Sequence, residues 1–438
     1  MRVYVSPLHL MLCGVSTVFL FIPKDLDTMS MSSSAAETPV RHPWLAVTAV
    51  GLATFSVVTT EMLPVGLLTP IASTLETSTG TAGLMISLPA LLAALFAPLV
   101  VIASGGHDRR RILCGLLGLL VIANIASALA VSLPWMLVAR ILVGFCMGGI
   151  WAIAGGLASR LVPEHSVGLA TSIIFGGVAA ASVLGVPLGA LIGDLAGWRW
   201  AFGSMALLSG LVLSLHLAVI PSLPVASSAT IRQFRQQLGN RKLQVGLAMT
   251  LLLVAGHFGA FTFVRPLLLS LSGFDAQWIG GLLFAYGIMG IAGNFLAGII
   301  AARRTTLTLM GIALGLLLTP VLFLVIGNSN AGGGVALLGW GLAYGGVSVG
   351  LMTWIMKVAP RAVETATALY VGIFNIGIAL GSWAGGRIVD AFGLTANLWL
   401  AGAAAAVALL LIMGIGVTEQ KQGAANRRAR GRPWGTDV

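Results

Sequence analysis

A few ionisable side chains lie inside long apolar stretches of this sequence, and they are the first candidates for chemistry. Glu61 is the only charged residue in the run from Trp44 to Leu68. In an apolar run long enough to cross a membrane, an ion is costly unless it is paired, protonated or in contact with water. Glu61, with its neighbour Thr60, is therefore expected to carry a proton, to contact a substrate or to hold a structural arginine.

Arg140 lies alone in a second apolar run. At about 1.5 Å per helical residue, Glu61 and Arg140 fall at comparable depth in the membrane, and we expect them to pair. A carboxylate whose pairing changes as a cavity opens would change its proton affinity, which would couple a proton gradient to transport. The alternative is a static structural pair.

His257 and Arg265 occupy a third run. Because an imidazole titrates near neutral pH, His257 is a candidate for relaying a proton or binding a substrate hydroxyl, although one hydrogen bond to a neighbouring helix would also satisfy it. Arg265 is close to the end of its run, where its stem can reach the membrane interface. It is therefore either a site residue or an interfacial anchor.

Aromatic and amide side chains in several runs form a further group of candidates. Aromatic faces would stack on a purine ring, and amides would bind ribose hydroxyls. Aromatic residues in membrane helices also serve as packing or interface anchors, and that alternative stays open for each one. The group consists of Trp151, Phe263, Tyr286, Trp340, Tyr344, Trp354, Asn294 and Asn375.

The composition determines which elements position these residues. The chain has 438 residues, of which 58% are hydrophobic and only 8% charged, whereas soluble domains carry about 25% charged residues. A polytopic membrane protein is therefore predicted. The net charge of +11 lies mainly in short connections and tails and not in one stripe, which argues against nucleic acid as a partner.

About twelve apolar runs are long enough to span a bilayer, so the predicted fold is all-α, with twelve transmembrane helices in two six-helix halves. Residues 1–43 differ from the rest and are expected to be a poorly ordered extension or a mis-assigned start. The runs are approximately 44–68, 82–104, 112–131, 135–157, 168–192, 200–220, 244–270, 277–301, 305–326, 333–356, 366–388 and 394–416.

The basic residues indicate the orientation. Of 24 Lys and Arg, twelve lie in connections after even-numbered runs and eight in the tails, whereas Arg199 and Arg387 alone follow odd-numbered runs. By the positive-inside rule both termini are cytoplasmic. Residues 221–243 form the longest connection, a cytoplasmic linker between an N-terminal half, 44–220, and a C-terminal half, 244–417, with a basic tail at 418–438.

Weak repeats support the two halves. Thr60-x-x-x-Pro64 returns as Thr262-x-x-x-Pro266, and glycines at 185, 189 and 193 return at 377, 381 and 385. Repeated halves with a substrate site between them are typical of secondary transporters that work by alternating access.

Several motifs resemble the major facilitator superfamily, in particular its proton-antiporter branch for drug and metabolite efflux. SGGHDRRRILCG resembles the family's loop between spans 2 and 3, LVARILVGFCMGG its buried-arginine motif, and GVPLGALIGDLAGWRWAF its antiporter motif in span 5. EMLPVGLLTPIA, GGIWAIAGGLASRLVP and GAFTFVRP are most similar to purine ribonucleoside efflux pumps, and next to sugar efflux transporters.

The resemblance implies roles in conformational change for two groups of residues. Asp108 with Arg109, Arg110 and Arg111 would latch and release as the halves rock, although a positive-inside anchor is the simpler alternative. The motif in span 5 contributes Gly185, Pro187, Gly189 and Gly193, where small residues let two helices touch and slide.

The function expected from these observations is proton-coupled efflux of a small organic molecule, with purine ribonucleosides first and sugars or mixed drugs as alternatives. The proton gradient supplies the energy, and no cofactor is expected. We expect a monomer in the lipid bilayer of the inner membrane. No GxxxxGK[ST] loop for ATP is present, and an integral-membrane enzyme or a channel are remote alternatives.

Overall fold

The computed structural model describes residues 42–103, 108–223, 231–360 and 362–430, and these residues are almost entirely helical. The expected N-terminal extension falls almost wholly outside them. The α-helices are α1 (Pro43–Thr74), α2 (Thr79–Ala82), α3 (Leu84–Ala103), α4 (Arg109–Ala128), α5 (Leu133–Leu161), α6 (Val167–Ala180), α7 (Val186–Ala196), α8 (Trp198–Val219), α9 (Ile231–Leu238), α10 (Arg241–Phe261), α11 (Val264–Ser270), α12 (Ala276–Val325), α13 (Asn330–Val358) and α14 (Val363–Arg430). A 3₁₀ turn, η2 (Glu164–Ser166), precedes α6, and a π turn, η3 (Ala181–Gly185), precedes α7.

Ten helical stretches of the described chain are long and apolar enough to cross a membrane. Two of them are long enough to cross it twice. Residue Arg304 is non-helical within α12, and Gly393, with φ of +85°, is non-helical within α14. Each of these helices therefore turns back on itself, and the described residues contain twelve apolar passages, as the sequence predicts.

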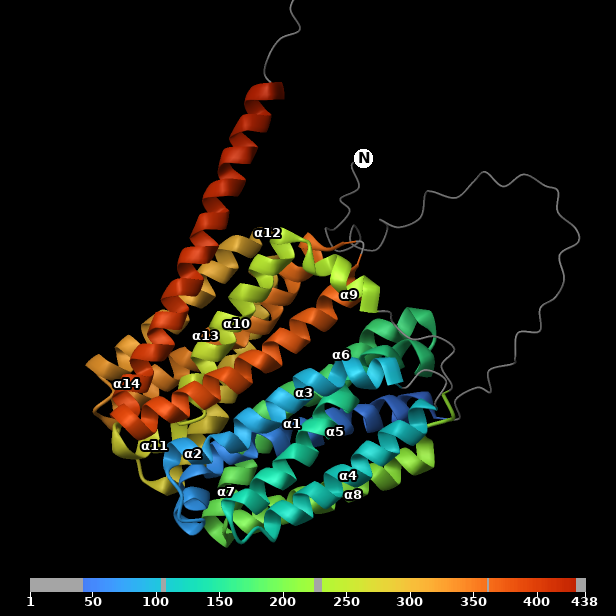
Figure 1. The fold of residues 1–438 in the computed structure, drawn as a ribbon, viewed down its shortest axis with the longest axis vertical. Coiled ribbons are helices and arrows are strands. Elements are labelled where there is room, and N and C mark those ends of the chain that lie inside the picture. The colour runs from blue at the N-terminus through green and yellow to red at the C-terminus, as the bar shows by residue number, and fades with distance from the viewer. Residues whose placement is uncertain (1–41, 104–107, 224–230, 361, 431–438) are drawn as a thin grey trace, which may run out of the picture. The chain divides into compact units, whose positions relative to one another are not determined.

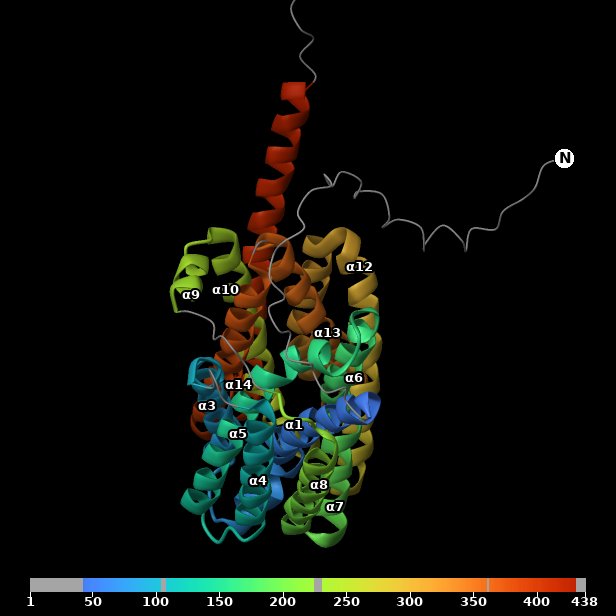
Figure 2. The ribbon, with the colours of Figure 1, turned by 90° about the vertical axis from the view of Figure 1, so that its right-hand side faces the viewer.

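The buried apolar residues gather mainly by position in the chain. One core consists of residues between 46 and 223, and a second consists mostly of residues between 243 and 412. We call α1–α8 the first helix set and α10–α14 the second helix set. Figure 1 and Figure 2 show the two sets side by side, and the contacts with the second set come mainly from α1, α2, α3, η3 and α7.

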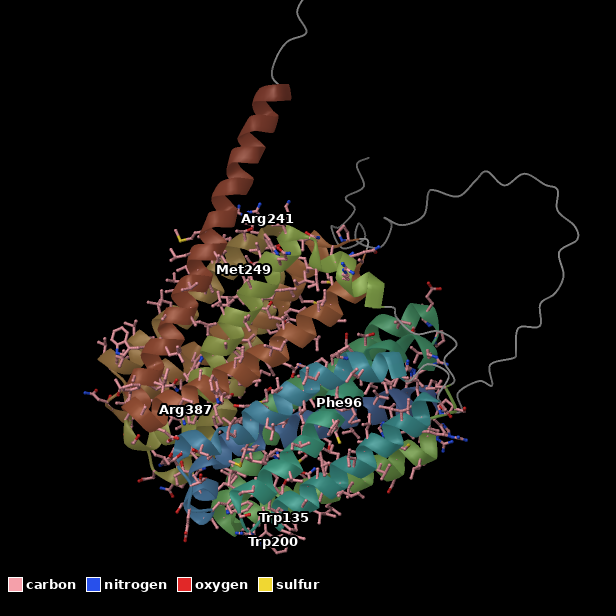
Figure 3. All side chains as sticks on the ribbon, in the orientation of Figure 1. Phe96, Trp135, Trp200, Arg241, Met249 and Arg387 are labelled. Atoms are coloured by element: carbon pink, nitrogen blue, oxygen red, sulfur yellow. The ribbon has the colours of Figure 1, made fainter. Side chains whose placement is uncertain are left out.

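Two exposed tryptophans lie at one end of the bundle. Trp135 and Trp200 are 50% and 68% exposed, and Figure 3 places both at the end opposite Arg241. Tryptophan is enriched where apolar helices meet the headgroup region of a bilayer. We call this the outer end, defined by the connections 75–78, 129–132, 197, 271–275, 326–329 and Gly393, which follow odd-numbered passages and which the charge distribution predicts to be non-cytoplasmic.

Candidate functional site

The buried arginine of the first helix set is bound to the backbone of α1. Arg140 on α5 has no exposed surface; its Nη1 donates to the Thr60 carbonyl at 2.8 Å and its Nη2 to Ser127 Oγ at 2.8 Å. Its guanidinium carbon lies 4.9 Å from the centre of the Phe202 ring. The Thr60 carbonyl is available because its helical donor would be residue 64, and Pro64 has no N–H.

Glu61 and Arg140 do not form the salt bridge that the sequence argument expects. The one ion pair within 4.0 Å among the described residues joins Arg265 to Asp194. Glu61 is fully buried, and neither of its carboxyl oxygens has a hydrogen-bond partner in this part of the chain. The two terminal nitrogens of Arg140 donate to a carbonyl and a hydroxyl, and Glu61 stays a neighbour without a direct contact.

A network of neutral polar side chains continues from this arginine. Asn124 on α4 donates to Thr60 Oγ1 at 3.1 Å and to Ser209 Oγ at 3.4 Å, and Ser209 shares a 2.8 Å hydrogen bond with Ser56. Three residues of this network are not among the candidates predicted from the sequence: Asn124, Ser127 and Ser209. Their signal was present, because each is a polar residue within an apolar run, but serines in membrane helices commonly bond their own backbone.

The second helix set buries aromatic rings at its centre. His257 on α10 lies between two parallel rings, with Tyr344 of α13 at a centroid distance of 3.4 Å and Phe261 at 4.9 Å. Tyr286 of α12 continues the stack beyond Phe261 at 4.8 Å. We call these four residues the aromatic column. Trp340 stands edge-on beside it, 5.4 Å from His257.

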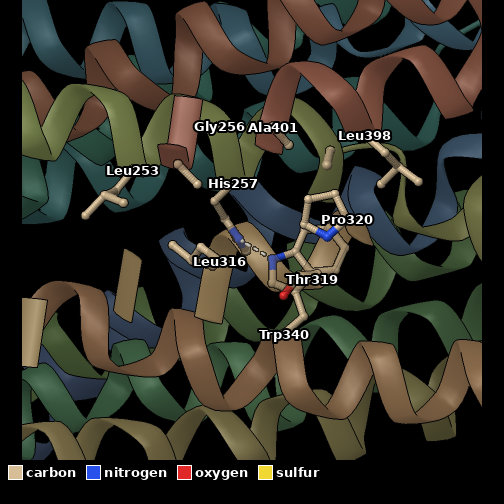
Figure 4. Close-up of a pocket in the computed structure, with 11 residues that line it drawn as sticks. Leu253, Gly256, His257, Leu316, Thr319, Pro320, Trp340, Leu398 and Ala401 are labelled. Atoms are coloured by element: carbon tan, nitrogen blue, oxygen red, sulfur yellow. Dashed lines mark hydrogen bonds between the residues drawn. The ribbon is translucent and has the colours of Figure 1, made fainter. Parts of the chain in front are cut away.

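Trp340 also determines the tautomer of His257. The indole nitrogen donates to His257 Nδ1 at 3.0 Å, as Figure 4 shows. Because an indole N–H can only donate, Nδ1 accepts, and the proton of the neutral ring is on Nε2. His257 Nε2 and Tyr286 Oη are buried without a hydrogen-bond partner in the described chain. A small pocket of the second set, formed by α10, α12, α13 and α14, contains His257, Thr319 and Trp340 in its wall.

The other predicted site residues are dispersed. Trp151 on α5 lies 5.6 Å from the ring of Phe175. Asn375 donates to the carbonyl of Val371 in its own helix, and its Oδ1 is buried without a partner in the described chain.

Two further aromatic candidates are packing residues in this conformation. Phe263 is 1% exposed and lies against Gly83 of the first set, where a Cβ would overlap its ring. Trp354 is 5% exposed, and its indole donates to the Lys242 carbonyl at 3.4 Å, at the start of α10.

The predicted gating loop is fastened to the end of α8. Asp108 caps α4 and accepts from the N–H of Leu223 at 2.8 Å and from Ser222 Oγ at 2.8 Å. Burial acts to raise the pKa of Asp108, but these bonds and one from the Arg110 N–H outweigh it and hold the pKa below its usual value. The backbone N–H of Arg109 and the side chain of Arg110 donate to carbonyls of Leu223 and Leu217. Arg111 is exposed, and a gating role for the loop stays a prediction.

The glycines of the span 5 motif face α1. A Cβ at Gly185, Gly189 or Gly193 would collide with Thr59, Leu63 or Leu67 respectively, three residues spaced by one helical turn. Pro187 is in the first turn of α7, a position that suits proline. Its carbonyl lies against Gly280 of α12. The motif therefore sets how closely α7 approaches α1.

The sequence allows Arg265 to be either a site residue or an interfacial anchor. In the structure its side chain is buried and does not reach the surface of the bundle. It is 3% exposed, and its Nη2 donates to Asp194 Oδ1 at 2.6 Å while its Nη1 donates to the Gly66 carbonyl at 2.6 Å. The reason is the position of α11, which packs against α1. The sequence argument missed Asp194, although it is the only acid in the apolar stretch Leu188–Leu195.

Comparisons with known proteins agree with this architecture. The chain is 32% identical over 367 residues to the purine ribonucleoside efflux pump NepI of Salmonella paratyphi B, covering 84% of this chain and 92% of the relative, and equally similar to its counterpart in Salmonella enteritidis. A crystal structure of the nucleoside transporter NupG matches with a TM-score of 0.70 at 13% identity, covering 84% of this chain and 99% of that one.

A bacterial homologue of the human lysosomal transporter Spinster matches with a TM-score of 0.69 at 16% identity, covering 91% and 100% of the two chains. Both TM-scores show that the fold is shared with these transporters, and the predicted all-α membrane fold is confirmed. The family model described as Major Facilitator Superfamily matches residues 50–370. This chain therefore belongs to the Major Facilitator Superfamily and is a membrane transporter.

Proposed function

We propose that this transporter exports purine ribonucleosides across the inner membrane and that an inward flow of protons drives the export. The observation that carries the substrate assignment is the 32% identity, over 84% of the chain, to a pump named for that activity. The aromatic column supports it, because stacked rings suit a flat purine base. Sugars and mixed drugs are the substrates to test against it.

Glu61 is the proposed proton carrier. It is an acid within an apolar helix, fully buried, and next to Thr60, whose carbonyl Arg140 binds. An unpaired ion at such a place is costly, whereas a protonated carboxyl group is neutral. If the path opens to the outside, Glu61 takes up a proton as substrate leaves; if it opens to the inside, the proton is released and substrate enters.

The aromatic column is the proposed substrate contact. His257 Nε2 offers a hydrogen-bond donor, and Tyr286 Oη offers a hydroxyl, in a part of the second set that is otherwise apolar. A base that stacks on the half-buried ring of Tyr344, at the end of the column, would place its ring nitrogens and carbonyl oxygens near such groups. Trp340 holds His257 in the tautomer that can donate.

The arrangement of the helices supports alternating access. We infer that residues 44–220 and 244–417 move as two six-helix halves, joined by the cytoplasmic linker 221–243. The contacts between the two sets come mainly from α1, α2, α3, η3 and α7 of the first set and from α11, α12 and α14 of the second, and rocking of one half against the other would break and remake these contacts.

Inverted membrane vesicles containing the full chain test the proposal. Radiolabelled inosine or guanosine should accumulate inside them when the lumen is acidified, and an ionophore that dissipates the proton gradient should abolish the accumulation. Vesicles without the chain are the control. Accumulation of a sugar or a cationic drug in place of nucleosides would overturn the substrate assignment, and nucleoside accumulation unaffected by the ionophore would overturn the proton coupling.

A further inference from the structure

Two prolines in α1 each leave a backbone carbonyl without its helical donor. Pro64 frees the carbonyl of Thr60, and Pro70 frees the carbonyl of Gly66, because proline has no N–H for the residue four positions earlier. Each freed carbonyl accepts from a buried arginine, Thr60 from Arg140 at 2.8 Å and Gly66 from Arg265 at 2.6 Å. A buried carbonyl without a donor is costly, so each arginine stabilises α1 at the carbonyl that it binds.

The two arginines belong to different helix sets. Arg140 belongs to α5 and joins it to α1 and α4 of the same set, whereas Arg265 belongs to α11 and crosses from the second set to the first. Arg265 makes a second contact across the same boundary, the 2.6 Å ion pair with Asp194 on α7. One guanidinium thus holds α11 against both α1 and α7.

A second contact between the sets lies at the same end of the bundle. Asp390 of α14 accepts from Ser78 Oγ at 2.6 Å, from the N–H of Gly80 at 2.8 Å and from Thr81 Oγ1 at 3.2 Å. Gly80 and Gly386 approach so closely that a Cβ on either would overlap the other's carbonyl. The turn before α3 is therefore bound to the end of the first passage of α14.

We propose that Arg265 is the centre of a latch that keeps the outer end of the transport path closed, with Pro70 as the residue that creates half of its binding site. In the closed state Arg265 binds Asp194 and the freed Gly66 carbonyl, and Asp390 binds the turn at Ser78–Thr81. Release of substrate to the outside requires all of these bonds to break. The proposal rests on the alternating access proposed above and is independent of the substrate.

Pro70 has a specific energetic role in this latch. When α11 moves away, the Gly66 carbonyl loses Arg265 and has no helical N–H to replace it, so the open state carries an unsatisfied acceptor or must recruit water. Replacement of Pro70 by alanine supplies the missing N–H in both states. The variant should therefore favour the open state although it removes none of the hydrogen-bond acceptors of Arg265.

Distances between spin labels measure the latch without any substrate. Cys13, Cys114 and Cys146 are replaced by serine in the full chain, and labels are placed at Val131 and Phe392, each 77% exposed at the outer end. Arg265→Lys keeps the charge but cannot bind two acceptors in a fork, and Asp194→Asn removes the ion pair. Each of these two variants should raise the ratio of long to short label distances about tenfold, because one charge-assisted hydrogen bond shifts an equilibrium by about that factor. Pro70→Ala should raise the same ratio several-fold.

A second label pair distinguishes an opened gate from a loosened fold. His165 on η2 and Leu307 on α12 are exposed and follow even-numbered passages, so their distance should shorten in the same variants. Pro98→Ala, at an exposed proline of α3, is the matched control and should leave both pairs unchanged. Unchanged outer distances in Arg265→Lys and Asp194→Asn would overturn the latch, and opening in those two without opening in Pro70→Ala would overturn the role of the proline.

Discussion

Both helix sets contain the motif Thr-x-x-x-Pro, at Thr60–Pro64 and at Thr262–Pro266. The buried side chains around the two copies differ. In the first set, the Thr60 carbonyl accepts from Arg140 and the Thr60 hydroxyl accepts from Asn124. In the second set, Thr262 shares a 2.8 Å hydrogen bond with the hydroxyl of Ser382, and the nearby aromatic column supplies rings where the first set has an ion.

The difference suggests a division of labour. A buried cation and a buried acid can respond to a proton, whereas stacked rings respond to the shape of a flat ligand. We expect changes in the first set to alter how transport is driven and changes in the second set to alter how tightly substrate is held. Substitutions matched across the two sets can test this expectation.

The largest effect is expected at Glu61. In Glu61→Gln the side chain keeps its size but cannot exchange a proton, so gradient-driven accumulation of nucleoside in inverted vesicles should fall to the background of vesicles without the protein. Exchange of internal for external nucleoside, which needs no net proton flow, should persist. Glu76→Gln, at an exposed acid in the connection after α1, is the control and should transport normally. Gradient-driven transport by Glu61→Gln would disprove the coupling role.

The next effect is expected at Arg140. Lysine keeps the charge in Arg140→Lys, but its compact ammonium group cannot donate to Thr60 and Ser127 in the same fork geometry. The free energy of unfolding should fall by about 1.5–3 kcal/mol, the contribution of a hydrogen bond to a charged group. Unfolding in a detergent titration measures it.

Arg199→Lys is the matched control for that variant. Arg199 donates to the Ala130 carbonyl at 2.8 Å and stacks on Trp198, but it is exposed at the outer end. Water can replace its bonds, so its substitution should cost much less. Equal losses in the two variants would show that burial of Arg140 in the network does not strengthen its bonds.

A smaller, selective effect is expected in the aromatic column. Tyr344→Leu removes a ring that stacks on His257, and aromatic pairs contribute about 0.5–1.5 kcal/mol beyond their buried area. The nucleoside concentration for half-maximal transport should rise by about twofold to tenfold, with the maximal rate little changed. Tyr344→Phe, which keeps the ring, should behave as the original chain does.

Tyr370→Leu controls for the loss of any buried tyrosine. Tyr370 is 4% exposed and contacts Phe374, and it lies outside the column. An equal rise in its half-maximal concentration would remove the aromatic column from the proposed substrate site.

The sequence predicts the architecture better than it predicts the site. Runs of apolar residues determine where helices cross, and the spacing of the glycines in α7 predicts close packing that the contact with α1 confirms. The partner of a buried ion depends on side-chain direction across helices far apart in the chain. Arg140 and Glu61 are expected at the same depth in the membrane, and the sequence therefore predicts that they pair. In the structure Arg140 donates instead to the Thr60 carbonyl, which Pro64 leaves without a helical donor.

The partners of Arg265 cannot be predicted from the sequence either. Its place near the end of a run suggested the interface, but a short helix after α10 directs it toward α1 and Asp194. Both contacts could be anticipated in part, because a proline within a helix leaves the carbonyl four residues earlier without its N–H donor. Sequence alone does not say which arginine supplies it.

The last comparison, in stability alone, is between the glycine contacts of the two sets. A Cβ at Gly381 would meet the Ala255 carbonyl, part of a backbone that cannot move aside, whereas a Cβ at Gly189 would meet the end of the Leu63 side chain, which can rotate. Overpacking costs about 1–3 kcal/mol, so Gly381→Ala should lie at the upper end of that range and Gly189→Ala at the lower.

Gly176→Ala on α6, where a Cβ meets no atom within 4 Å, is the control and should be neutral or stabilising because alanine favours helix. Unfolding in the same detergent titration gives all three values. If Gly189→Ala cost as much as Gly381→Ala, Leu63 would be as fixed as a backbone, and α7 would be locked to α1 rather than free to slide along it. The first set would then have to move as a rigid body, with every rearrangement confined to the contacts that Arg265 and Asp390 make across the boundary.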